Sequence, residues 1–179
     1  MIEALISSKT RIKLLLKFFL NSKTTAYLRG LAAEFGESSN AIRLELNRFE
    51  KAGLLDAYSD GNKKMFRANV KHPLFEQIHK ILIKHVGLSK IIDEVIERLG
   101  DVKQVFLVGD LARGSDTGII DLLFVGNLDR QYLAELTAKV EKLIDRKVKY
   151  LIYTPEEFKP VAEAPDFEPG SLLIWNKDQ

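Results

Sequence analysis

The stretch Val105–Val125, VFLVGDLARGSDTGIIDLLFV, predicts the core of a sheet-containing domain. Two apolar runs, Val105–Val108 and Ile119–Val125, flank a turn that contains Gly109 and Gly114. Short apolar runs bounded by glycines are typical of buried strands. We therefore expect two strands joined by a glycine-bearing turn. We predict the α/β fold class, in its α+β form, for the whole chain.

The segments that follow extend the same domain, which we place at residues 101–179. A helix is expected from about Arg130 to Ile144, and a strand from Lys147 to Tyr153. Pro160–Gly170 is rich in proline and acidic residues, so we expect a loop there. Ser171–Trp175 then provides a last apolar strand or helix.

Residues 73–100 are predicted to link this domain to an earlier module. Pro73 is well placed to begin a helix, because the first helical turn does not use its amide hydrogens. A second helix is expected from Leu88 to Leu99. The apolar stripe of the first helix must be buried against the chain's own modules or a second subunit, so we expect a homodimer. The stripe consists of Leu74, Ile78, Ile81, Leu82 and His85.

Residues 1–72 are predicted to form three helices followed by a hairpin. The first helix is expected to carry Lys13 and Lys17 on its outer side, and glycines end the second and third helices. The helices are expected at Ser8–Leu20, at Tyr27–Phe35, and from Ser38 or Ser39 to Lys51. The hairpin is expected to join Leu54–Tyr58 to Met65–Ala68 through a turn at Asp60-Gly61-Asn62.

The third helix and the hairpin carry residues suited to DNA binding. On a helix of about 100° per residue, the inward stripe is formed by Ile42, Leu46 and Phe49. The opposite side carries Asn40, Arg43 and Asn47, with Arg48 at its edge, and the hairpin carries Lys63, Lys64 and Arg67. Arginine can bind guanine through two hydrogen bonds, and asparagine can bind adenine in the same way. Lysines bind phosphates without reading sequence.

Three helices followed by a basic hairpin resemble a winged helix-turn-helix of the ArsR type. In that arrangement an AGLL turn, here Ala52–Leu55, leads from the recognition helix into the wing. The resemblance implies a double-stranded DNA partner. It continues through Phe66–Asn69, His72–Leu74 and Val86–Leu88, which are similar to the stretch that joins a winged helix to a nucleotidyltransferase-like domain in a widespread group of bacterial proteins.

The central stretch resembles the minimal nucleotidyltransferase family. Its pattern is a strand, then G-S-x-A-R-G, then S-D-x-D-L on the next strand. The resemblance implies that the turn at Gly109 and Gly114 approaches nucleotide phosphates. It also implies that two aspartates of D-x-D hold a divalent metal, which strand geometry allows because residues i and i+2 share a face.

Three departures from this pattern argue against catalysis. Ile119 replaces the first aspartate, so that Asp121 stands alone, and Asp110 replaces the serine. Lys149 lies about where a third carboxylate is expected. We therefore lean toward a domain without enzymatic activity, and we expect it to bind no metal and no cofactor. The alternative is an active enzyme in which Asp110 or Asp116 joins Asp121 to bind Mg²⁺ and a nucleoside triphosphate.

A metal-free site is a further expectation for the same turn. Arg113 and Lys149, beside Gly109 and Gly114, are candidates for binding a nucleotide or another anion. The simpler interpretation is that these two cations pair with Asp110 and Asp121.

The charge distribution supports two modules. Among the 179 residues, positions 1–72 carry 13 Lys and Arg against 7 Asp and Glu, whereas positions 73–179 carry 14 against 18. A basic first module is the one expected to meet a polyanion. The chain has no cysteine, and its apolar runs are far shorter than the ~20 residues of a membrane helix. We therefore expect a cytoplasmic protein with no membrane partner.

Together these features predict a DNA-binding transcriptional regulator. The degenerate nucleotidyltransferase-like domain is expected to serve dimerisation, sensing of a nucleotide or other effector, or binding of a protein. One alternative is an active metal-dependent nucleotidyltransferase that modifies a protein or nucleic acid. A second alternative is an antitoxin-like protein-interaction module.

Overall fold

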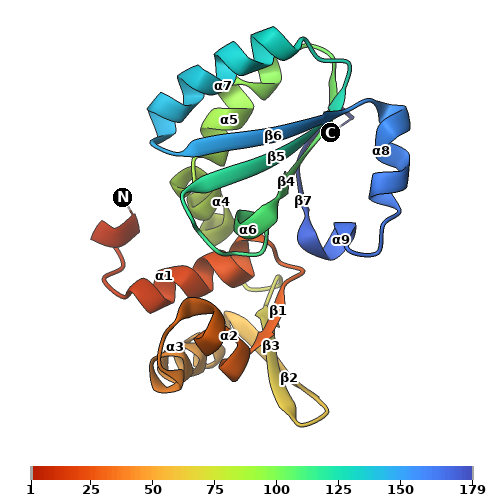
Figure 1. The fold of residues 1–179 in the computed structure, drawn as a ribbon. Helices are drawn as coiled ribbons and strands as arrows, with labels where there is room; N and C mark the ends of the chain where they lie inside the picture. The colour runs from red at the N-terminus through yellow and green to blue at the C-terminus, as the bar shows by residue number, and fades with distance from the viewer. Residues whose placement is uncertain (1, 179) are drawn as a thin grey trace. The chain divides into compact units, whose positions relative to one another are not determined.

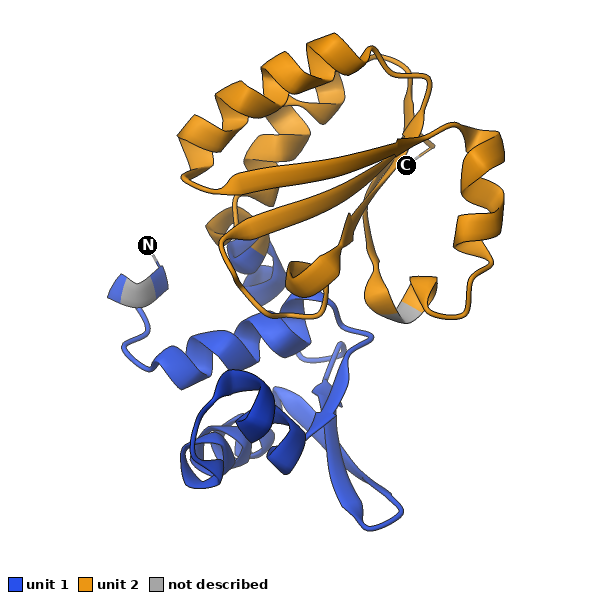
Figure 2. Cartoon of the chain, viewed as in Figure 1, with its two compact units in different colours: residues 1–82 blue, residues 83–179 orange. Residues whose placement is uncertain are grey.

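The chain forms two compact units, residues 1–82 and residues 83–179 (Figure 2). A computed structural model describes residues 2–178, apart from the side chains at positions 3 and 169. The boundary between the units falls inside helix α4 (Phe75–His85). Each unit has its own sheet, and the predicted α/β fold class is confirmed (Figure 1).

The first unit is a winged helix-turn-helix, as predicted. Its three-stranded antiparallel sheet has the order β1-β3-β2. Pairing of Asp60 with Lys63 leaves Gly61 and Asn62 as the turn of the wing, and Gly61 has a φ of 55°. Before α4, the elements are η1 (Ile2–Ala4), α1 (Lys9–Leu15), η2 (Leu16–Leu20), β1 (Thr25–Tyr27), α2 (Leu28–Phe35), α3 (Ser39–Lys51), β2 (Leu55–Asp60) and β3 (Lys63–Ala68).

Local signals in the sequence explain where α3 begins and ends. The Ser38 hydroxyl accepts a hydrogen bond from the Ala41 amide, which caps the first turn. The chain leaves the helix through Gly53, whose φ is 72°. The predicted inward stripe is buried, because Ile42, Leu46 and Phe49 are at most 4% exposed. This packing fixes the face of α3 that remains in solvent.

The first helix and Tyr27 differ from the sequence prediction. The helix is α-helical only to Leu15 and continues as the π-helical turn η2. Lys17 is buried, not outward-facing, because its ammonium group forms an ion pair with Glu34 at 2.8 Å. Tyr27 belongs to strand β1 and pairs with Met65, so the second helix begins one residue later than predicted.

The stripe predicted for α4 is also partly wrong. Leu82 is buried as expected, but Leu74 is 55% exposed and Ile81 is 44% exposed. Phe75 is buried instead, and its ring lies 5.6 Å from the ring of Phe19 in η2. The aromatic contact therefore sets which side of α4 faces the core of unit 1.

The second unit contains a four-stranded mixed sheet with the order β6-β5-β4-β7. β5 and β6 are parallel, and the other two pairs are antiparallel. Leu123 and Val125 of β5 pack with Phe158 of α8, and Leu122 and Phe124 on the opposite face are also buried. The elements are α5 (Leu88–Glu94), η3 (Ile96–Arg98), β4 (Val102–Val108), α6 (Gly109–Ala112), β5 (Ile119–Gly126), α7 (Arg130–Ile144), β6 (Lys147–Tyr153), α8 (Pro155–Ala162), α9 (Phe167–Gly170) and β7 (Leu172–Asn176).

The predicted strands and α7 are confirmed. The loop expected at Pro160–Gly170 is only partly right, because residues 163–166 form a turn between the helices α8 and α9. α8 starts with a capping box in which Thr154 and Glu157 exchange hydrogen bonds, and Pro155 stands in its first turn. The rings of Phe158 and Phe167 lie 5.4 Å apart and both contact Phe106. These aromatic contacts hold α8 and α9 on the sheet. The predicted helix from Leu88 to Leu99 breaks at Val95, beyond which η3 follows.

Candidate nucleic-acid interface

The outward face of α3 carries the predicted polar residues. Asn40, Arg43, Asn47 and Arg48 are all exposed. The guanidinium group of Arg48 also donates a hydrogen bond to Glu45 at 2.8 Å. One face of a surface helix therefore presents two amides and two guanidinium groups to solvent.

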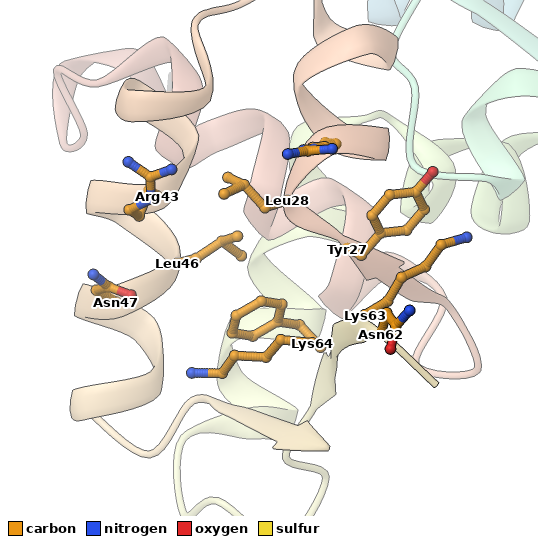
Figure 3. Close-up of a pocket in the computed structure, with 10 residues that line it drawn as sticks. Tyr27, Leu28, Arg43, Leu46, Asn47, Asn62, Lys63 and Lys64 are labelled. Carbon is orange, nitrogen blue, oxygen red and sulfur yellow. The ribbon is translucent and has the colours of Figure 1, made fainter. Parts of the chain in front are cut away.

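A groove of about 730 Å³ lies between α3 and the wing (Figure 3). Arg43 and Asn47 border it from α3, and Lys63 and Lys64 border it from the opposite strand. Its ten lining residues include four cations and no carboxylate. They are Tyr27, Leu28, Arg29, Arg43, Leu46, Asn47, Asn62, Lys63, Lys64 and Phe66.

The two wing lysines have different surroundings. The ammonium group of Lys63 lies 4.5 Å from the ring centre of Tyr27. The ammonium group of Lys64 lies 5.2 Å from the ring centre of Phe66 and donates hydrogen bonds to both oxygens of Glu50, at 2.8 and 2.7 Å. Lys63 therefore adds its charge to the groove, whereas Glu50 offsets much of the charge of Lys64.

The structure divides the predicted DNA-binding residues into two sets. Arg43, Asn47, Lys63 and Lys64 line the groove together. The remaining three, Asn40, Arg48 and Arg67, are exposed outside its lining. Arg67 lies 3.9 Å from Asp56 and 5.5 Å from the ring centre of Tyr58, on the wing.

The sequence interpretation missed three groove residues, Tyr27, Leu28 and Arg29. They stand where β1 runs into α2, far from the wing in the sequence. Only the pairing of β1 with β3 brings this segment beside Lys63 and Lys64. A three-residue strand has no periodic signal, so hydrophobic periodicity could not place this segment beside the wing.

Ion pairs attach α1 to the helix-turn-helix. Lys13 pairs with Glu37 at 2.6 Å, and Arg11 donates hydrogen bonds to both oxygens of Glu45, at 2.8 and 3.2 Å. Burial raises the pKa of the Glu45 carboxyl. The hydrogen bond and charge of Arg11, followed by those of Arg48, lower this pKa by more than burial raises it, so that the net pKa is below the ordinary value. The cations of α1 therefore hold α3 in place.

The glycine turn of unit 2 lies directly against Asp121. Gly109 has a φ of 70°, and a Cβ atom there would lie 2.6 Å from the Asp121 Oδ2. Asp110 and Arg113 are exposed at the two ends of the short helix α6, and Gly114 has a φ of 82°. Glycine is required at position 109 both for its backbone conformation and for the close approach of the carboxylate.

The donors around Asp121 do not fit a Mg²⁺ site. Its neighbours in the sheet register are Val108 on β4 and Lys149 on β6, neither of which is an oxygen ligand. Asp116 forms a two-fold ion pair with Arg146 and accepts a hydrogen bond from the Gly118 amide. Among the described side chains of residues 2–178, no three His, Cys, Asp or Glu residues form a group able to hold a metal.

Comparisons with known proteins do not identify a family. No protein-family profile matches the chain, and no curated protein matches it. The transcriptional regulator BldR from Sulfolobus solfataricus is similar at 15% identity, over 52% of this chain and 68% of that chain, with a TM-score of 0.37.

Within residues 2–178, no helix has the length and apolar character needed to cross a bilayer.

Two further solved structures are similar to part of this chain. A candidate nucleotidyltransferase from Sulfolobus solfataricus is 22% identical over 56% of this chain and 87% of that chain, with a TM-score of 0.35. The structure of the tri-AMPylated Shewanella oneidensis HEPN toxin in complex with the MNT antitoxin is 17% identical over 54% of this chain and 75% of that chain, with a TM-score of 0.37. Similarities of this size establish neither a family nor a function.

Proposed function

We propose that the protein is a DNA-binding transcriptional regulator that contacts duplex DNA through unit 1. The observation that carries this proposal is the groove beside α3, whose lining has four cations and no carboxylate. A surface of this kind attracts a polyanion, and the adjoining helix face supplies the amide and guanidinium groups that base edges require.

Each group has a proposed role. Arg43 binds a guanine, and Asn40 or Asn47 binds an adenine in the major groove. Lys63, Lys64 and Arg29 bind phosphates and supply affinity without sequence preference. Arg48 and Arg67, which are exposed outside the groove lining, contact the DNA backbone.

We further propose that unit 2 does not catalyse metal-dependent nucleotidyl transfer. Asp121 lacks a second carboxylate partner at the neighbouring strand positions, and Asp116 is held by Arg146. Unit 2 then serves association or the sensing of an effector. A homodimer is part of this proposal, and it also involves unit 1. We expect a second copy to bind where Leu74, just before α4, and Ile81 of α4 are exposed apolar residues.

The test of DNA binding compares three purified variants on a duplex selected by the wild-type protein. Arg43→Ala is expected to weaken binding by about 1–3 kcal/mol and to relax specificity at one base pair. Lys63→Ala is expected to weaken binding to all duplexes and to reduce the salt slope by about 1. Lys9→Ala removes an exposed lysine of α1 outside the groove and serves as the control. Equal affinity of all three variants would reject the proposed surface.

The test of unit 2 is incubation with labelled nucleoside triphosphates and Mg²⁺ or Mn²⁺. We expect no transfer of label to protein or nucleic acid. Transfer that occurs with the wild-type protein and disappears with Asp121→Ala would show that unit 2 is an enzyme.

A further inference from the structure

Leu44 lies exposed in the middle of the polar face of α3. Its side chain is 52% exposed, whereas the other large apolar residues of the helix are at most 4% exposed. Asn40 stands one turn before it, and Asn47 and Arg48 stand one turn after it. The face that we propose to read DNA therefore has an apolar centre.

A single exposed leucine does not by itself require a ligand. The position of Leu44 is what distinguishes it. At about 100° per residue, it lies within roughly 60° of Asn40 and of Asn47 around the helix axis. Any surface that receives the two amides also receives the Leu44 side chain. A duplex bound by this face must therefore accommodate an apolar group between its polar contacts.

We propose that Leu44 contacts the C5-methyl group of a thymine, an inference that rests on the proposed DNA binding of unit 1. In the major groove, thymine presents an apolar methyl group, and contact with an apolar side chain is the way in which proteins read it. An adenine bound by Asn40 or Asn47 is paired with thymine, so the methyl group lies in the same groove.

The dimensions of α3 and of the DNA double helix allow this contact. With a rise of about 1.5 Å per residue, Leu44 lies about 4.5–6 Å along α3 from either asparagine. Base pairs follow one another at about 3.4 Å along the DNA axis. Because a recognition helix lies in the major groove at an angle to that axis, this offset spans at most about two base pairs. The sites bound by the protein are therefore expected to contain a thymine at the base pair of a contacted adenine or one to two pairs away.

The test replaces each thymine of a selected duplex, one at a time, by deoxyuridine, which lacks only the methyl group. Burial of one methyl-sized group contributes about 0.8 kcal/mol, so wild-type binding is expected to weaken about fourfold at the contacted thymine. Leu44→Ala is expected to bind the unmodified duplex about fourfold more weakly and to lose its sensitivity to the uracil at that position. Leu143→Ala removes an exposed leucine of α7 in unit 2 and is expected to behave like the wild type.

The outcomes separate this inference from the proposed function. Wild-type binding that is unaffected by deoxyuridine at every position would overturn the role of Leu44 while leaving DNA binding intact. Equal sensitivity of the wild type and Leu44→Ala would overturn it as well. Failure of the wild type to bind any duplex would reject the inference together with the proposed function.

Discussion

The two units use their charged residues in different ways. In unit 1, Arg11 and Lys17 are paired with carboxylates, while Arg43 and Lys63 line a groove without any carboxylate in its lining. In unit 2, Asp116 is held by Arg146 and Asp121 lies against Gly109, while Asp110 and Arg113 of the glycine turn are exposed.

This difference teaches where a ligand can bind. Charges that are paired inside the protein stabilise or orient its elements, whereas like charges gathered at an open groove favour an oppositely charged partner. Unit 1 offers such a groove on the described part of the chain, and the surroundings of Asp121 in unit 2 do not supply a metal site. The predictions below test this contrast, beginning with the largest expected effect.

Gly126→Ala is expected to destabilise unit 2 by about 3 kcal/mol or more. Gly126 has a φ of 154°, and a Cβ atom there would collide with the carbonyl oxygen of Asp101. Trp175 is the only tryptophan and lies in β7 of unit 2, so its fluorescence during urea unfolding reports this unit. Binding of DNA by the folded protein is expected to persist.

The matched control is Gly118→Ala. Gly118 has a φ of 79°, but nothing lies within 4 Å of the added Cβ atom. We expect a loss of about 1–2 kcal/mol from backbone strain alone. Equal losses for the two variants would contradict the close approach at Gly126.

Glu45→Ala is expected to destabilise unit 1 by about 2 kcal/mol. It leaves Arg11 without its partner, and the loss is smaller than for a fully buried pair because Arg11 is partly exposed. Urea unfolding followed by circular dichroism measures this loss, while the Trp175 transition is expected to stay in place. Glu50→Ala removes a more exposed carboxylate of the same helix and is expected to cost less than about 0.5 kcal/mol.

Acid is expected to weaken unit 1 through the same ion pairs. Burial raises the pKa of Glu37, but hydrogen bonds from Lys13 and Thr10 lower it by more than burial raises it. The net pKa values of Glu37 and Glu45 are therefore both below the ordinary value. Their stabilisation is therefore complete above the ordinary glutamate pKa of 4.5 and is lost as pH falls through the lower pKa values of the folded state.

The pH prediction is checked by urea unfolding between pH 6 and pH 3. The wild type is expected to lose stability across the acidic part of this range. Glu45→Gln, which cannot titrate, is expected to lose less than the wild type. Parallel curves for the two proteins would show that the Glu45 ion pairs make no contribution.

Glu50→Gln is expected to increase DNA affinity by about two- to threefold at low salt. The change removes the negative charge that offsets Lys64 and frees the lysine for a phosphate, an effect of the size of an exposed ion pair. Fluorescence anisotropy with a labelled duplex measures the difference. Glu97→Gln, an exposed carboxylate of unit 2, is the control, and an equal increase with both variants would indicate a general charge effect.

Periodic and capped segments were predictable from the sequence. The inward stripe of α3, its start at Ser38 or Ser39 and the bounds of α7 and β6 were confirmed, because local capping and helical spacing determine them. The α8–α9 region was not predictable in this way. Its helices depend on contacts of Phe158 and Phe167 with Phe106, which lies far away in the sequence.

The candidate site was predictable only in part. Arg43, Asn47, Lys63 and Lys64 were found from helix spacing and the hairpin turn, and the structure brings them together. Tyr27 and Arg29 were missed because strand pairing, not sequence proximity, places them in the groove. Burial of Glu45 was missed because a carboxylate becomes stable inside a unit only when a distant cation, here Arg11, reaches it.

The central claim is that unit 1 binds duplex DNA through the cations of its groove. It is tested most directly by selecting random duplexes with the purified chain of 179 residues and then measuring affinity against salt concentration. With three to four groove cations bound to phosphates, we predict that the logarithm of the binding constant falls with the logarithm of salt with a slope of about −3. Retention of no duplex at low salt, or an affinity that does not change with salt, would contradict the claim.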